Sequence, residues 1–192
     1  MPSCAIAATP YLSNGLGRAF GLMENQYCIA GTGSSQPKGL ITGGTSAITA
    51  ASTTAITAAE LVSLYHALPE PYTSNPAEVI FLTRNATLGA LRALASSSVF
   101  TFNLQPQGDQ GAQQLYGHKV AVSGYMEAAT TGKKSILVTN LAAGYILIER
   151  AGMVMARNPY LLQATGQVAL FSTMRFGGTT TVAEATQILT QA

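Results

Sequence analysis

The stretch GYILIERAGMVMARNPYLLQATGQVALFSTMRFGG, residues 144–178, decides the fold of this chain. Its first run, from Tyr145 to Met155, mixes apolar and β-branched residues with few charges, and its second run, residues 166–176, alternates without leaving either face purely polar. Pro159 lies between them and cannot donate to a β-ladder. We therefore predict a long antiparallel ribbon joined by a wide turn. Because a two-stranded ribbon is marginally stable alone, another element has to cover it.

The composition restricts the class of protein. The 192 residues suffice for one sizeable domain or two small ones. Ten Lys and Arg against eight Asp and Glu give a net charge of +2, which is too small to indicate a nucleic-acid groove. Charged residues make up 9% of the chain, against about a quarter in ordinary soluble proteins. Other subunits that cover much of the surface would explain this low content, and so would a neutral surface of Ser, Thr, Asn and Gln.

Cysteine usage and hydropathy exclude several further classes. Cys4 and Cys28 have no CxxC spacing, so they indicate neither a zinc site nor a redox motif and are expected to be small buried residues. The longest charge-free apolar segment, residues 135–148, is shorter than a bilayer span and is interrupted by polar residues. The N-terminus lacks the basic start and apolar core of a signal peptide. We expect a soluble protein that is intracellular when it is made.

An amphipathic helix is predicted near the N-terminus. Thr9 is a suitable N-cap, Pro10 is a suitable first helical residue, and Gly31 is expected to end the helix. Glycines at positions 15, 17 and 21 disfavour this helix by up to about 1 kcal/mol each relative to alanine, which suggests that another element packs closely on it. The apolar stripe recurs at three- and four-residue steps: Leu12, Leu16, Ala19, Phe20, Met23 and Tyr27.

Residues 31–41, GTGSSQPKGLI, are glycine-rich but do not match a phosphate-binding loop. Such a loop needs the pattern GxxxxGK[ST] at the start of a helix that follows a strand, whereas these glycines follow a helix. A turn-rich connector is the expected structure. The next segment, residues 42–59, is rich in Ser, Thr and Ala and is expected to be an exposed loop or a weak strand pair.

Helices and strands alternate through the middle of the chain, and the fold class is α+β. A helix from Ala58 is expected to end at Pro69 and Pro71, and a second helix follows Asn85. Lys133 and Lys134 are expected at a solvated hairpin tip. The apolar faces of the two helices are Leu61, Leu64, Tyr65 and Leu68, and Leu88, Leu91, Leu94 and Ala95. The expected strands are residues 77–83, 118–123, 136–138 and 179–183, with a loop-rich segment at 96–114 and a frayed tail or short helix at 184–191.

No residue pattern indicates catalysis, a cofactor or a metal. His66 has no ligand partner one helical turn away. His118 stands beside Lys119 without a positioned acid or nucleophile. The sequence contains neither a GxSxG elbow nor a paired-carboxylate pattern. We therefore predict that the protein is not an enzyme and has no catalytic, cofactor-binding or metal-binding residues.

The order of these segments resembles the major capsid proteins of tailed bacteriophages, of the Hong Kong 97 phage type. Residues 31–40, GTGSSQPKGL, are similar to that family's GTGxxQPxGL segment, and residues 115–120, LYGHKV, are similar to its LxGxPV. The other matching segments, in family order, are the helix 60–68, the strand 79–83, the helix 84–94, and the motifs GYILIER at 144–150, RNPY at 157–160 and MRFGG at 174–178.

The resemblance implies an α+β fold with two lobes. Residues 1–40 and 133–178 would form a peripheral domain of long helix and long β-ribbon, and residues 41–132 and 179–192 an axial α/β domain. It also implies self-assembly into pentamers and hexamers that form an icosahedral shell around double-stranded DNA, which the chain would contact weakly and without specificity. The expected location is the virion, after assembly in the cytoplasm of a bacterial host.

The chain departs from the family pattern in three places. Lys119 replaces the usual proline, and residues 139–141, Thr-Asn-Leu, replace the usual Gly-Asp-Phe. Family members usually carry a long N-terminal arm and an extended loop before the long helix, whereas this sequence begins almost at the helix. The alternatives are a truncated gene, a minimal capsid gene, or one part of a split protein whose partner chain supplies the arm and loop. Some relatives are covalently cross-linked through Lys and Asn, and we carry over no such pair.

Two other functions remain open at this point. An encapsulin-like bacterial nanocompartment has a related shell that encloses a cargo enzyme instead of DNA. A truncated prophage remnant would keep the fold without assembling. The three differ in what, if anything, the protein encloses.

Overall fold

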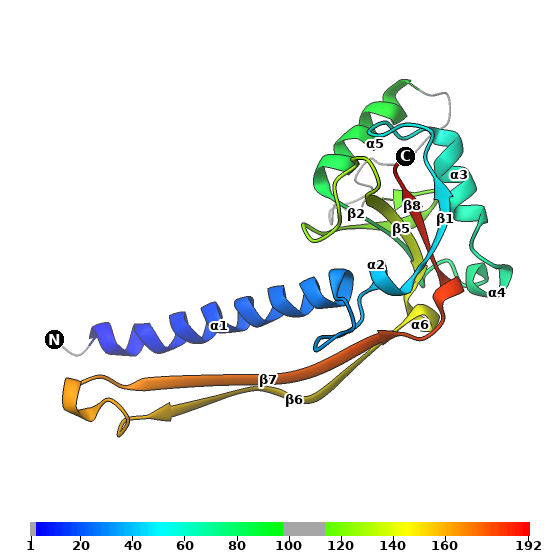
Figure 1. Ribbon diagram of the computed structural model, residues 1–192. Coiled ribbons are helices and arrows are strands. Elements are labelled where there is room, and N and C mark those ends of the chain that lie inside the picture. Colours follow the sequence, from blue (N-terminus) through cyan, green and yellow to red (C-terminus); the bar gives the residue numbers. More distant parts are fainter. Residues whose placement is uncertain (1–2, 98–113) are drawn as a thin grey trace.

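The computed structural model describes residues 3–97 and 114–192, which form a compact body and a long arm (Figure 1). The body is a mixed six-stranded sheet with helices packed on it. The arm consists of the N-terminal helix and a two-stranded ribbon, which run away from the body on the same side. The N-terminus lies at the far end of the arm and the C-terminus lies in the body. The expected α+β class is confirmed.

The six-stranded sheet is built almost entirely from pairings between distant parts of the chain. β5 lies between β8 and β2 and is antiparallel to both, whereas β1 is parallel to β8 and β4 is parallel to β2. Across the sheet the strands are β1 (Thr45–Thr49), β8 (Thr186–Thr190), β5 (Lys134–Asn140), β2 (Val79–Thr83), β4 (His118–Val122) and β3 (Gln114–Leu115).

Both faces of this sheet are apolar. Successive residues of each central strand point to opposite sides, and both sets contain apolar side chains. One face packs against α3 (Ala58–His66) and α5 (Asn85–Ser97). The other packs against the end of α1 (Ser3–Ala30), α2 (Leu40–Gly43) and the loop at Met126. The first face contains Val79, Phe81, Ile136, Val138 and Leu189, and the second contains Leu82, Leu137 and Ile188.

The two helices on the first face follow the sequence prediction. Leu61 and Leu64 of α3 and Leu88 and Leu91 of α5 are buried. A capping box begins α3: the Glu60 amide donates to Thr57 Oγ1 at 3.4 Å, and the Thr57 amide donates to Glu60 Oε2 at 2.7 Å. α3 ends before Pro69 as expected, whereas Pro71 lies in a separate short helix, α4 (Glu70–Thr73).

The C-terminal segment is a central strand, and the prediction of a frayed tail or short helix at 184–191 is wrong. β8 runs through the middle of the sheet, preceded by the 3₁₀ turn η2 (Ala183–Ala185). Thr186 in β8 and Gln191 just after it are buried, and each has a hydrogen-bond partner, as buried polar side chains require. Thr186 Oγ1 lies 2.8 Å from Thr139 Oγ1, and Gln191 Nε2 donates to Ser135 Oγ at 2.7 Å.

Strand pairing also corrects the expected solvated hairpin tip at Lys134. Lys134 begins β5, and its Nζ donates to the Ile41 carbonyl at 2.7 Å, so this lysine is tied into the body. β5 has its pairing partners in the six-stranded sheet, not in the ribbon. The segment 134–140 therefore lies with the body. In the low-complexity segment 42–59, β1 pairs with β8 while Ala51–Ala55 stay mostly exposed.

The arm contains the predicted helix and ribbon. α1 begins at Ser3, so the expected start at Thr9 is wrong and Pro10 lies inside the helix. β6 (Tyr145–Asn158) and β7 (Ala169–Thr180) form the antiparallel ribbon. α6 (Leu141–Gly144), capped by the Asn140 side chain on the Ala143 amide at 3.1 Å, turns the chain from β5 into β6. Most of the expected loop at 96–114 lies outside the described residues.

The substitution Leu189→Ala tests the position of β8. Leu189 has no exposed surface, so truncation should leave a cavity and lower the free energy of unfolding by about 2–5 kcal/mol. Urea denaturation followed by circular dichroism measures this change. The control is Val62→Ala on the exposed side of α3, which should change stability by about 0.5 kcal/mol or less. A frayed tail would instead tolerate Leu189→Ala.

Candidate interaction surface

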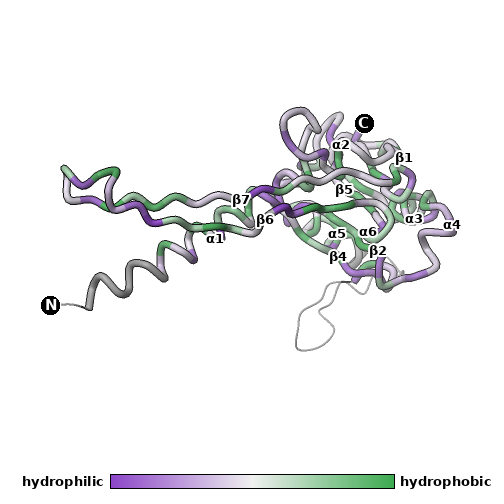
Figure 2. Tube along the Cα trace, turned by 90° about the horizontal axis from the view of Figure 1, so that it is seen from below, coloured by the Kyte–Doolittle hydropathy of each residue, from purple (hydrophilic) through white to green (hydrophobic). Residues whose placement is uncertain are grey.

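Large apolar side chains lie exposed along the whole arm. Ile146, Leu147 and Ile148 are consecutive and all exposed, so the ribbon presents apolar groups on both faces at this point. Figure 2 shows hydrophobic stretches along the ribbon far from the body. Monomeric proteins rarely expose contiguous apolar patches of this kind. The other exposed apolar residues of the arm are Tyr11, Leu12, Leu22, Met23, Met153, Val154, Tyr160, Leu161, Leu162, Val168, Leu170 and Phe171.

The helix covers the ribbon only near the body. There the ring of Tyr27 on α1 lies 6.2 Å from the ring of Phe176 on β7, centroid to centroid. Further out, Phe171 on β7 is 46% exposed, and a Cβ added at Gly15, Gly17 or Gly21 would meet no atom within 4 Å. The sequence suggested that another element packs closely on these glycines. Within the described residues, no element of the same chain does so.

The root of the arm is held together by backbone contacts that require glycine. The Gly39 amide donates to the Gly31 carbonyl at 2.9 Å, and the Lys38 amide donates to the Gly178 carbonyl at 2.9 Å. A Cβ at Gly31 or Gly39 would overlap neighbouring backbone atoms. The segment 31–39 is therefore a tight connector that ties the end of α1 to β7, as the sequence predicted.

Titratable groups meet where α1 crosses the ribbon. Burial, and then repulsion from Glu149 on β6, raise the pKa of Glu24 on α1 above its usual value of 4.5. One turn further along α1, burial raises the pKa of the Cys28 thiol, which lies beside Tyr145. The pKa of Tyr145 is also raised, chiefly by burial of its hydroxyl. The surroundings of this junction favour the neutral forms of these three side chains. The spacing of the residues in the sequence did not indicate that they meet.

The tip of the ribbon is ordered by its own hydrogen bonds. Asn158 Oδ1 accepts from the amides of Tyr160 at 2.9 Å and Leu161 at 3.3 Å, which is the local turn that an Asn-Pro pair favours. The 3₁₀ turn η1 (Gln163–Thr165) follows and ends at Gly166, whose φ of 67° suits glycine. Tyr160 is 80% exposed and Leu161 is 61% exposed, so the turn holds apolar groups out in solvent.

The two histidines and Cys28 take structural positions. His118 is buried, with Nδ1 at 3.1 Å from the Pro76 carbonyl and Nε2 at 3.0 Å from the Tyr65 hydroxyl. His66 is exposed, and its ring packs edge-on against Tyr65. Cys28 is half-buried, and the side chain of Cys4 lies outside the described residues. Within 3–97 and 114–192, no group of three or more His, Cys, Asp or Glu could hold a metal ion.

None of the helices in residues 3–97 and 114–192 is long and apolar enough to cross a bilayer.

The sequence matches the model of the phage capsid family over residues 4–190. The chain therefore belongs to the phage capsid family, and its α+β fold is of the Hong Kong 97 phage type. No curated protein sequence is significantly similar to it.

Solved structures with the same fold come from several particles. The chain is similar to the capsid of an empty GTA particle, with a TM-score of 0.80, 22% identity and 96% of this chain covered. It is also similar to the holo-SrpI encapsulin of Synechococcus elongatus PCC 7942 (0.73, 13% and 98%) and to the capsid of the cyanophage P-SCSP1u (0.64, 14% and 95%). These matches span 66%, 66% and 65% of the respective solved chains, so the sequence covers about two thirds of their length.

The substitution Glu24→Gln tests the acidic junction. The pKa of Glu24 in the folded protein lies above its ordinary value of 4.5. Its contribution to stability is therefore fully present below about pH 4.5 and is lost as the pH rises through the higher pKa of the folded state. Glutamine stays neutral, so the variant should melt at a higher temperature than wild type at pH 7, and the difference should shrink toward pH 4.5. Thermal melts of dilute protein measure this. The exposed control Glu70→Gln should show no such trend, and an equal shift at both pH values would contradict the assignment.

Proposed function

We propose that this chain is the major capsid (head) protein of a tailed bacteriophage. It self-assembles into pentamers and hexamers that close an icosahedral shell around double-stranded DNA, first in the cytoplasm of a bacterial host and finally as part of the virion. The family match supports a structural role. One observation carries the proposal: the arm exposes apolar groups along both faces of its ribbon.

The physical argument is that the arm is unstable unless other copies cover it. A two-stranded ribbon is marginal in water, and this one is covered by its own helix only near the body. Neighbouring subunits would bury the exposed side chains further out, such as Val154, Leu170 and Phe171. Each Å² of apolar surface removed from water would stabilise the assembly by about 25 cal/mol. The low charge content of 9% fits a surface that is largely covered in the assembly.

We assign the arm to the peripheral domain and the body to the axial domain. The peripheral domain keeps residues 1–40 and the ribbon up to 178, but its second segment starts after Asn140 because β5 pairs inside the body sheet. Residues 41–140 and 179–192 then form the axial domain. In this role the protein needs no catalysis, cofactor or metal, and its net charge of +2 suits weak, non-specific contact with packaged DNA.

The second candidate is an encapsulin-like compartment, which the similarity to the SrpI encapsulin favours. Such a shell would co-purify with a cargo protein, whereas a phage head would contain DNA. A truncated prophage remnant is the third candidate, and it would stay a monomer at high concentration.

Mass spectrometry of isolated shell subunits identifies which polypeptide supplies the further third of chain that the solved relatives contain, whether it is continuous with this sequence or a separate arm-bearing chain.

Assembly can be tested at the tip of the ribbon. Purified wild-type protein should form capsomers or shells in gel filtration and in electron micrographs. Leu161→Asp should prevent this because a carboxylate would replace an exposed apolar group, while the melting temperature of the dilute subunit stays within about 2 °C of wild type, as for other exposed sites. Gln163→Asp adds the same charge at the same tip and should still assemble. Normal shells from Leu161→Asp would contradict a role for the tip in assembly.

A further inference from the structure

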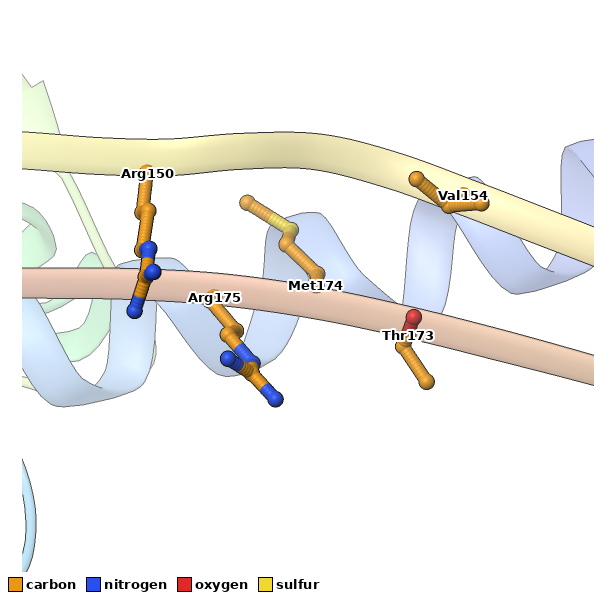
Figure 3. A pocket seen from close by; sticks show the side chains of 5 residues that line it. All are labelled: Arg150, Val154, Thr173, Met174 and Arg175. Atoms are coloured by element: carbon orange, nitrogen blue, oxygen red, sulfur yellow. The ribbon is translucent and has the colours of Figure 1, made fainter.

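Two arginines meet on the ribbon because of an irregularity in its pairing. Glu149 on β6 lies opposite Phe176 on β7, and Ala151 lies opposite Arg175, so Arg150 is an extra residue at a β-bulge. A bulge redirects the side chain of its extra residue. In Figure 3 the Arg150 side chain crosses over β7, and it lines the same hollow as the side chain of Arg175.

The two guanidinium groups have no counter-ion within the described residues. Both side chains are exposed, and neither has a hydrogen-bond or ion-pair partner among the described residues. The ion pair that the described residues do contain joins Lys133 and Glu127 in the body, at 3.2 Å. Two like charges at close range repel, and a bound anion removes that cost. Guanidinium groups bind planar carboxylates and phosphates through paired hydrogen bonds. The pair is therefore a candidate anion site.

Apolar surface adjoins the two charges on both sides. Val154 and Met174 line a hollow of about 260 Å³ together with both arginines, and Ile148 and Phe176 line a neighbouring one. A free inorganic ion would use only the guanidinium groups. A carboxylate on a folded protein surface would also cover these apolar side chains, so the surroundings favour a protein partner.

The charge distribution of the chain indicates which protein surface is complementary. Residues 1–40 and 145–180, which contain the arm, carry five basic and two acidic residues, a net charge of +3. The remaining described residues carry five basic and five acidic residues, so the body is neutral overall, but it holds five of the seven described acidic residues. The basic arm of one copy is thus complementary to exposed carboxylates on the body of another.

Two glutamates of the body are available for this contact. Glu60, Glu78 and Glu127 already accept hydrogen bonds from neighbouring groups. The carboxylates of Glu70 and Glu184 are exposed and have no partner within residues 3–97 and 114–192. Their elements adjoin the same short helix: η2 packs on α6, and Asn140, which caps α6, donates to the carbonyl of Tyr72 in α4 at 3.0 Å.

These glutamates cannot reach the arginines of their own chain. Arg175 lies five residues before the end of β7 at Thr180, a distance of roughly 16 Å along the ribbon. α4 lies still further away, on the side of the body opposite the arm (Figures 1 and 2). We propose that Arg150 and Arg175 of one copy bind the carboxylates of Glu70 and Glu184 of a second copy. The contact is head-to-tail, as closed rings of subunits require, and it rests on the proposed capsid function.

A charge-reversal series tests this contact. Arg150→Glu with Arg175→Glu, and separately Glu70→Lys with Glu184→Lys, should each raise the protein concentration needed for assembly by roughly tenfold or more at low salt, because like charges then face each other. The quadruple variant should assemble as readily as wild type. The control Arg18→Glu with Arg157→Glu makes the same charge change elsewhere on the arm and should assemble normally. Sedimentation velocity measures assembly, and circular dichroism verifies that each variant is folded.

The possible outcomes separate this contact from the capsid function itself. Normal assembly of the arginine variant, or failure of the folded quadruple variant to recover, would overturn the contact while leaving the capsid function intact. The arginine variant could instead lose binding to a short DNA duplex. If the quadruple variant then recovers neither DNA binding nor assembly, the site belongs to phosphate and the contact is overturned as well. A wild-type chain that stays monomeric at every concentration would refute the capsid function, and the contact with it.

Discussion

The antiparallel pairing of β5 with β8 is the interaction on which the rest of the structure depends. These two strands lie side by side in the centre of the body sheet, and the chain leaves them through α6 and η2 to form the two strands of the ribbon. The hydroxyls of Thr139 and Thr186 bond to each other at 2.8 Å where the ribbon begins. Because the ribbon has little support of its own, its direction is set by this buried pair of strands.

An arm anchored at one end only has consequences for stability and for association. Its root is closed by the connector from Gly31 to Gly39 and by the contact of Tyr27 with Phe176, and beyond that point the ribbon is apolar on both faces. The charges follow the same division, because basic groups are in excess on the arm and most of the described acidic residues lie on the body. Apolar area supplies affinity between copies, whereas charge complementarity selects which surfaces meet. The shape and the composition of the chain thus favour the same head-to-tail mode of association.

Local patterns predicted the ribbon, the long helix and the two body helices, because each depends on neighbours three, four or two residues away. They failed where distant residues decide. The segment 184–191 is polar enough to read as a tail, and only the partners Thr139 and Ser135 show that its side chains can be buried. Lys134 read as a solvated tip because its acceptor, the Ile41 carbonyl, is 93 residues away in sequence. The bulge at Arg150, opposite Arg175 and Phe176, depends on the register of β6 against β7. The alternation of apolar and polar residues along each strand does not give that register.

The sequence by itself determined the elements of the arm, the scarcity of charge and, through the order of its motifs, the family. These properties are local or compositional, so they can be predicted without knowing the tertiary contacts. Only the tertiary structure decided that the last strand lies in the middle of the body sheet and that residues 134–140 belong with it. It also showed that two arginines on the ribbon and two glutamates on the body have no partner among the described residues. The reason is that burial and pairing are properties of contacts between distant segments, and neither composition nor periodicity contains them.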